Sequence, residues 1–127
     1  MTKSIDLAWI VVKDFKQAVK FYTETVGLNL LKMNEQYGWA ELQGPDGGAM
    51  LGISAEQAGN PYKAGQNACL TLTVDDLEKT RDSFLQKGAK FIGDIQEVPG
   101  HVRLLMGIDG DGNHFQLAQM LSFENLS

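Results

Sequence analysis

The stretch Gly107-Ile108-Asp109-Gly110-Asp111-Gly112-Asn113-His114-Phe115-Gln116-Leu117 lies near the end of a 127-residue chain. Its first half has the glycines and aspartates that are typical of a tight turn. The residues that follow alternate between polar and apolar, which puts His114 and Gln116 on one face of a predicted strand and Phe115 and Leu117 on the other. An earlier stretch, Gly44-Pro45-Asp46-Gly47-Gly48-Ala49-Met50-Leu51-Gly52-Ile53, has the same plan, which indicates an internal repeat.

The repeat extends over most of the chain. Each half is predicted to contain a strand, a helix and three further strands. The first helix begins after Asp14 and ends at Gly27, and the second begins after Asp76 and ends at Gly88, because Asp caps helix starts and Gly caps helix ends. The predicted strands are 5–12, 28–33, 37–43 and 49–54 in the first half, and 68–74, 90–98, 102–108 and 113–119 in the second. The two modules are about 4–54 and 68–120, and the linker is 55–67.

The number of strands after each helix limits the choice of fold. A ferredoxin-like module would place two strands between its helices, and a doubly wound fold needs a helix between most pairs of strands. Three strands follow each helix here, which argues against both folds.

Composition excludes several functional classes. Sixteen acidic and eleven basic residues give a net charge of −5, with no basic stripe for nucleic acid. The longest apolar run is 7–12, far too short to span a membrane, and we find no signal peptide. The single cysteine, Cys69, cannot form an internal disulfide and fits a reducing compartment. We expect a single cytoplasmic domain with no nucleic-acid or membrane partner.

Several segments resemble a known family. The segments Leu7-Ala8-Trp9-Ile10-Val11-Val12, Lys13-Asp14-Phe15, Ala18-Val19-Lys20-Phe21-Tyr22 and Val26-Gly27-Leu28 resemble the opening of a vicinal-oxygen-chelate module. The segment Asp109-Gly110-Asp111-Gly112-Asn113, with Phe115-Gln116-Leu117 after it, resembles that family's final turn and strand. This is the superfamily of glyoxalases, bleomycin resistance proteins and extradiol dioxygenases. The resemblance implies an α+β fold of two βαβββ modules, with a curved mixed sheet around a cleft and helices outside. It also implies a homodimer.

Enzymes of that family hold a divalent metal with His and Glu side chains from the first and last strand of each module. The corresponding positions here are Leu7, Cys69, Gln116 and either Gly52 or Leu51, depending on the strand register. Leu and Gly have no ligating side chain, and Gln is a weak replacement for a carboxylate. We therefore expect no metal cofactor of the family type. The alternative is a divalent metal in a non-standard site.

The resemblance and the alternation together predict the residues that line the cleft. The predicted ligand-binding residues are Leu7, Trp9, Trp39, Glu41, Cys69, Thr71, Arg103, His114 and Gln116. Alternatives remain for several of them. Trp9, Tyr37 and Trp39 form either a stacking wall or ordinary core, of which we favour core. Arg103 lines the cleft or an outward face. Cys69 is either a buried small residue, which we favour, or a nucleophile activated by His114.

The functional hypothesis follows from the incomplete ligand set. We expect a protein that sequesters or senses a small organic molecule, either neutral or cationic, without a fixed chemical step. The alternative is a glyoxalase-like lyase or isomerase, or a dioxygenase, that holds a metal differently. The sequence leaves open whether any reaction is catalysed.

Overall fold

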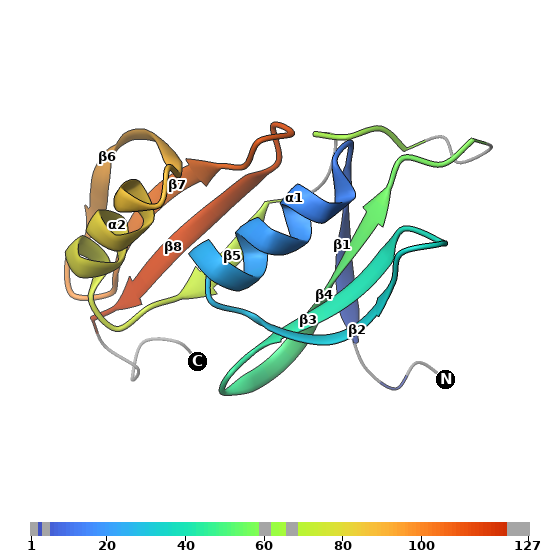
Figure 1. The fold of residues 1–127 in the computed structure, drawn as a ribbon. Helices are drawn as coiled ribbons and strands as arrows, with labels where there is room; N and C mark the ends of the chain where they lie inside the picture. The colour runs from blue at the N-terminus through green and yellow to red at the C-terminus, as the bar shows by residue number, and fades with distance from the viewer. Residues whose placement is uncertain (1–2, 4–5, 59–61, 66–68, 122–127) are drawn as a thin grey trace. The chain divides into compact units, whose positions relative to one another are not determined.

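Each half of the sequence forms a four-stranded mixed sheet with one helical segment (Figure 1). A computed structural model describes residue 3 and the ranges 6–58, 62–65 and 69–121. The chain divides into two units. Unit 1 comprises 1–67 and 110–113, and unit 2 comprises 68–109 and 114–127.

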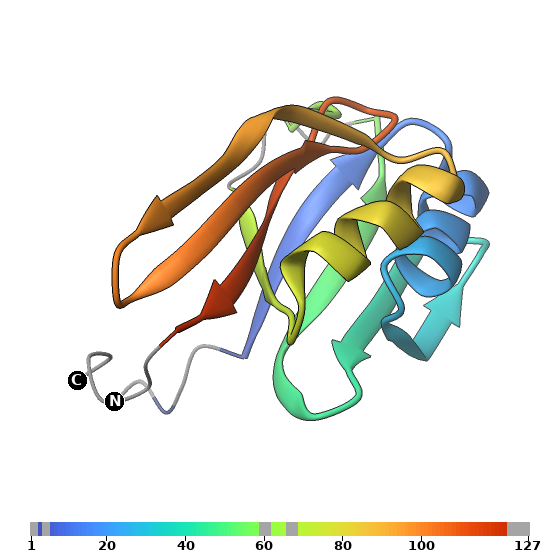
Figure 2. The ribbon, with the colours of Figure 1, turned by 90° about the vertical axis from the view of Figure 1, so that its left-hand side faces the viewer.

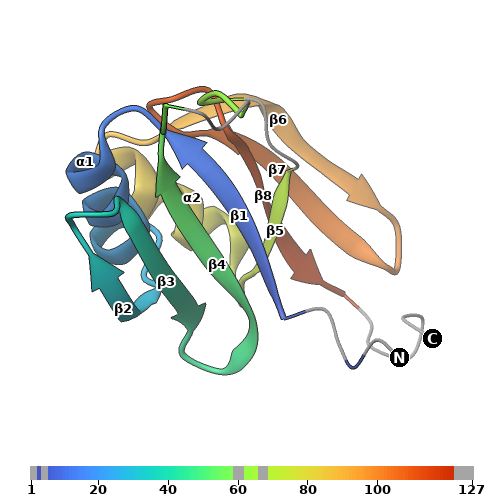
Figure 3. The same cartoon turned by 90° about the vertical axis from the view of Figure 1, so that its right-hand side faces the viewer.

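Unit 1 has the strand order β1-β4-β3-β2, which Figure 3 shows side by side. The pairing of β1 with β4 is parallel, and the other two pairings are antiparallel. Parallel neighbours need a crossover connection, and here the helical segment and two strands supply it. The elements are β1 (Leu7–Val12), α1 (Phe15–Lys20), the π-helix η1 (Phe21–Thr25), β2 (Asn29–Asn34), β3 (Trp39–Gly44) and β4 (Gly47–Ala55).

The helix of unit 1 begins where the sequence predicts. The Asp14 carboxylate accepts a hydrogen bond of 3.1 Å from the backbone N–H of Gln17, which satisfies one of the open donors of the first turn. Its last turn differs from a regular α-helix because Val26 N–H donates to the Phe21 carbonyl, a π-type bond. The chain then leaves at Gly27 with φ +91°, a conformation that favours glycine.

Unit 2 has the equivalent order β5-β8-β7-β6, with β5 parallel to β8 (Figure 2, yellow-green to red). The aromatic rings of Phe84, Phe91 and Phe115 pack between α2 and the sheet, with centroids 6.1 to 6.2 Å apart. Phe115 therefore points toward α2, as its alternation with Gln116 predicts. The elements are β5 (Leu70–Thr73), α2 (Leu77–Gln86), β6 (Lys90–Val98), β7 (Val102–Ile108) and β8 (His114–Met120).

Side chains of the sheet also fix the start of α2. The Asp76 carboxylate accepts a hydrogen bond from Lys79 N–H at 3.0 Å, and Gln119 Oε1 of β8 accepts one from Leu77 N–H at 2.8 Å. Two of the open donors of the helix are thus satisfied, one by a local cap and one by the neighbouring strand.

The predicted α+β fold with two βαβββ repeats is confirmed. Strands β6 and β7 have the predicted bounds, and the others differ by a few residues. The predicted starts of the first and fifth strands include residues 5 and 68, which lie outside the described part of the chain. Among the described residues, no helix is long and apolar enough to cross a membrane.

Candidate functional site

Strand register decides which residues of unit 1 share a face. Gly52 of β4 lies beside Trp9 on one side and Glu41 on the other. Laterally paired residues, and residues two apart on a strand, lie on the same face of a sheet. Leu7, Trp9, Trp39, Glu41 and Gly52 therefore share one face. Leu51 lies on the opposite face, which α1 covers, so the strand register is the one that aligns Gly52 with Trp9.

Three aromatic rings meet on this face. The Trp9 and Trp39 centroids are 6.3 Å apart at 63°, and those of Trp9 and Tyr62 are 5.5 Å apart at 86°. Both are edge-to-face contacts, the arrangement that the quadrupoles of aromatic rings favour. The two indoles are half-buried, and Tyr62 is 53% exposed. The rings are thus not core. They present apolar surface beside the sheet.

A carboxylate lies beside the rings. Trp39 Nε1–H donates a hydrogen bond of 2.8 Å to Glu41 Oε2, and the Glu41 side chain is half-buried. Within the described ranges, Glu41 has no ion pair with Lys, Arg or His. We call Trp9, Trp39, Glu41, Gly52 and Tyr62 the aromatic face. It combines flat apolar surface with one negative charge.

The backbone of β4 approaches the Trp39 indole closely at Gly52. A Cβ atom at this position would overlap Cη2 of Trp39 and lie 2.9 Å from Trp39 Cζ2 and from Trp9 Cβ. Real Cβ atoms essentially never make such contacts, so only glycine fits here without a shift of the indole.

The four metal-ligand positions of the family do not fit a divalent ion. Leu7 and Gly52 supply no donor, and the indole fills the space that a longer side chain at position 52 would occupy. Gln116 Oε1 accepts a hydrogen bond of 3.2 Å from the Thr71 hydroxyl. No group of three or more His, Cys, Asp or Glu residues is placed to hold a metal in the part of the chain that the structure describes.

The other predicted residues lie on unit 2. Thr71 and Met106 lie beside Gln116, one on each neighbouring strand, on the face away from α2. His114 is exposed at the start of β8. These residues form a polar and sulfur-containing strip on the sheet of unit 2.

Cys69 is exposed, so the expectation of a buried small residue is wrong. Its Sγ lies 3.7 Å from Met106 Sδ. Partial desolvation raises the pKa of the Cys69 thiol, which keeps it protonated at neutral pH and disfavours nucleophilic attack. Between the described residues, no hydrogen bond joins Cys69 to His114.

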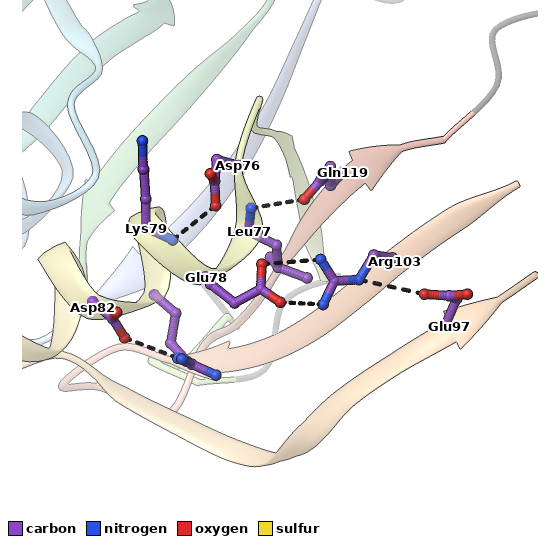
Figure 4. Close-up of polar contacts among 9 residues, drawn as sticks. Asp76, Leu77, Glu78, Lys79, Asp82, Glu97, Arg103 and Gln119 are labelled. Carbon is purple, nitrogen blue, oxygen red and sulfur yellow. Dashed lines mark hydrogen bonds and ion pairs between the residues drawn. The ribbon is translucent and has the colours of Figure 1, made fainter.

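Arg103 lies on the opposite face of unit 2 from Gln116, so it lines the outward side, the second of the two predicted alternatives. It pairs with Gln119 across the β7–β8 ladder. Both guanidinium nitrogens Nη1 and Nη2 donate to the Glu78 carboxylate of α2, and Nε lies 3.5 Å from Glu97 (Figure 4). This hydrogen bonding lowers the pKa of Glu78 to about 2.

Sequence patterns alone gave no indication of two neighbours of these faces. Tyr62 lies in the segment assigned as a linker, yet its ring packs on Trp9. Met106 lies on a strand that is apolar on both faces, so alternation gave no reason to select it. An aromatic residue in an otherwise polar linker is the one signal that points to Tyr62.

The acidic turn after β7 serves structure. Asp111 Oδ1 accepts a hydrogen bond of 2.9 Å from Lys13 N–H, and Asn113 Nδ2 donates one of 3.2 Å to the Val11 carbonyl. Asn113 is buried, at 1% exposed. The turn residues are therefore engaged with the end of β1, in keeping with the tight turn that the sequence predicts.

Comparison with known proteins gives the same family as the resemblance found in the sequence. The profile of the Glyoxalase/Bleomycin resistance protein/Dioxygenase superfamily matches residues 4–117. A search of curated proteins finds no match.

Solved structures give the same fold. TnmS3, an antibiotic binding protein from Streptomyces sp. CB03234, is 26% identical with a TM-score of 0.76, over 94% of this chain and 97% of that one. A glyoxalase/bleomycin resistance protein from the same organism is 28% identical with a TM-score of 0.73, over 91% of this chain and 100% of that one. A superfamily member from Sphaerobacter thermophilus DSM 20745 is 19% identical with a TM-score of 0.76, over 93% and 98%, which is a likeness of fold alone.

Proposed function

The chain belongs to the Glyoxalase/Bleomycin resistance protein/Dioxygenase superfamily, and from this premise we propose that it is a binding protein for a planar organic molecule, neutral or cationic. The aromatic face is the proposed contact surface. The observation that carries the proposal is the group of Trp9, Trp39 and Tyr62 beside the Glu41 carboxylate.

The aromatic side chains support a flat ligand. Indole and phenol rings offer large apolar surfaces, and ring pairs contribute about 0.5–1.5 kcal/mol beyond the area that they bury. Small-molecule sites combine such surfaces with a few polar groups that fix orientation. Glu41 and the exposed Tyr62 supply polar groups here.

The charge supports a neutral or cationic ligand. Glu41 is negative when ionised, and the whole chain carries a net charge of −5. A cation beside indole faces gains from the ring quadrupole as well as from the carboxylate. A phosphorylated ligand would be repelled by both the carboxylate and the net charge.

Sequestration without a reaction is supported by two points. Two of the four family ligand positions, Leu7 and Gly52, carry no donor. A relative of 26% identity over most of both chains is described as an antibiotic binding protein. The proposed role is therefore to hold a drug-like molecule, as a resistance protein or a sensor would.

Fluorescence titration with two tricyclic probes tests this proposal. Proflavine is planar and cationic, and acridone is planar and neutral. We expect saturable binding of both, with quenching of the tryptophans. The Glu41→Gln variant keeps an oxygen that accepts from the indole but removes the charge. It should weaken proflavine about tenfold, equivalent to about 1.4 kcal/mol, and leave acridone unchanged.

The matched control is Glu35→Gln, which removes the same charge from an exposed turn of unit 1. It should leave both affinities unchanged. The proposal is overturned if neither probe binds. A further outcome is that the protein binds neither probe and, loaded with nickel or zinc, converts the hemithioacetal of methylglyoxal and glutathione. That outcome would establish the glyoxalase-like alternative with a non-standard metal site.

A further inference from the structure

Gly52 lies so close to the Trp39 indole that residue 52 accepts no side chain unless the ring shifts. The indole fills the volume into which any side chain at residue 52 would project. Gly44, another strand glycine of the same sheet, has no such neighbour. A Cβ at Gly44 would meet nothing nearer than the Gly47 carbonyl oxygen at 3.7 Å, an ordinary contact.

Two neighbours hold the indole over Gly52. Glu41 fixes the indole N–H at 2.8 Å, and Trp9 packs on the ring at 63°. A hydrogen bond to a charged acceptor is stronger than a neutral one. The ring is half-buried, and its partners limit its rotation.

We propose that Trp39 is the specificity-determining residue of the aromatic face. Its indole closes the space above β4. The face then accepts a flat molecule that lies across the rings and rejects one that carries a group projecting toward Gly52. The same indole excludes a ligating side chain at residue 52, so an aromatic ring occupies the place of the metal ligand that the family positions on this strand. The ligand part rests on the proposed function, and the pairing of Trp39 with Gly52 does not.

A double-mutant cycle tests the pairing without any ligand. The Gly52→Ala variant should lower the urea midpoint of unfolding by about 1 M, because the added methyl group overpacks the sheet against the indole. In the Trp39→Ala background the same change should cost less, and the loss that remains comes from the contact of 2.9 Å with Trp9 Cβ, which is still present. Gly44→Ala, the matched control, meets nothing nearer than 3.7 Å and should cost little in either background. If Trp39→Ala does not fold, Trp39→Val serves in its place because valine suits a strand. An equal loss from Gly52→Ala in both backgrounds would refute the pairing.

A pair of probes tests the specificity. Ethidium is a planar cation like proflavine, but it carries a phenyl ring that stands out of the plane. The wild type should bind proflavine at least about tenfold more tightly than ethidium, because the projecting phenyl ring would meet the Trp39 indole. In Trp39→Ala the ratio of the two dissociation constants should fall to about one, because the space above Gly52 is then open.

The outcomes separate the two proposals. If neither probe binds the wild type, the proposed function fails, and the double-mutant cycle still decides the pairing. If both probes bind and their ratio is the same in wild type and Trp39→Ala, the proposed function stands and Trp39 does not set specificity.

Discussion

At the scale of single residues, the Glu41 carboxylate accepts a hydrogen bond from the Trp39 indole, and this bond orients the ring. Glu41 holds Trp39 Nε1 at 2.8 Å and so keeps the ring over Gly52. A half-buried carboxylate loses part of its hydration, and the indole N–H supplies a hydrogen bond in place of water. The indole is neutral, so this hydrogen bond leaves the negative charge of the carboxylate in place. The charge therefore remains available to a ligand.

Loss of this hydrogen bond should loosen the indole. The chain has two tryptophans, so Trp9→Phe leaves Trp39 as the only indole reporter. In this background, Glu41→Leu should increase acrylamide quenching of Trp39 by about two-fold, since an unheld side chain samples more solvent-exposed rotamers. Glu41→Gln should change quenching little, because its amide oxygen still accepts. Equal quenching in all three proteins would show that packing alone holds the ring.

At the scale of elements, helix α2 is held on its sheet by side chains from two strands. Gln119 accepts from the first helical N–H, and Arg103 binds Glu78 and Glu97 (Figure 4). Arg suits this position because its planar fork matches a carboxylate with two parallel hydrogen bonds. Glu78 is near the helix N-terminus, where a negative charge is also favourable.

The lowered pKa of Glu78 predicts a pH dependence. Because its folded pKa is about 2 and its ordinary value is 4.5, the ion pair contributes its full stability above pH 4.5 and loses it as pH falls toward 2. Arg103→Leu should therefore lower the urea midpoint of unfolding at pH 7. The difference in midpoint between wild type and Arg103→Leu, which we call the gap, should narrow steadily between pH 4.5 and pH 2.

Lys16→Leu, which removes an exposed positive charge from α1, controls for net charge. The gap between wild type and Arg103→Leu should also shrink in 1 M salt, since the pair is solvent-exposed and screened. A gap that is independent of pH and salt would mean that Arg103 acts through packing of its aliphatic stem.

The sequence predicted the elements well because their signals are local. Asp14 and Asp76 cap helices through bonds to residues three positions ahead, and alternation assigned Phe115 and Gln116 to opposite faces. Arg103 was ambiguous because its partner Glu78 lies on α2, 25 residues earlier. Tyr62 was missed for a similar reason: its contact with Trp9 depends on how the chain returns to the sheet.

At the scale of the whole molecule, the two repeats do not divide the chain cleanly. Residues 110–113 belong to unit 1, although the chain enters them from β7 and leaves them into β8 of unit 2. The turn groups with unit 1 because Asn113 donates a hydrogen bond to the Val11 carbonyl and Asp111 accepts one from Lys13 N–H, at the end of β1. Each repeat is thus continuous in the sequence, but the turn 110–113 of the second repeat groups with unit 1.

Asn113→Ala should lower the free energy of unfolding by about 1–3 kcal/mol, because it removes a buried donor to the Val11 carbonyl. Urea unfolding followed by circular dichroism measures this loss. Asp46→Ala, an exposed position in the equivalent turn of the first repeat, should stay within about 0.5 kcal/mol of wild type. A loss at Asn113 no greater than that at Asp46 would show that the turn contributes little to stability.

The close fit of Gly52 under the Trp39 ring also limits how this chain can evolve. A single substitution that restores a metal-ligating side chain at residue 52 must first displace an indole held by a carboxylate and a second tryptophan. A smaller side chain at residue 39 is needed before residue 52 can accept one without displacing the ring. Each residue of the pair therefore makes a change of the other costly, and a side chain at residue 52 requires a compensating change at residue 39.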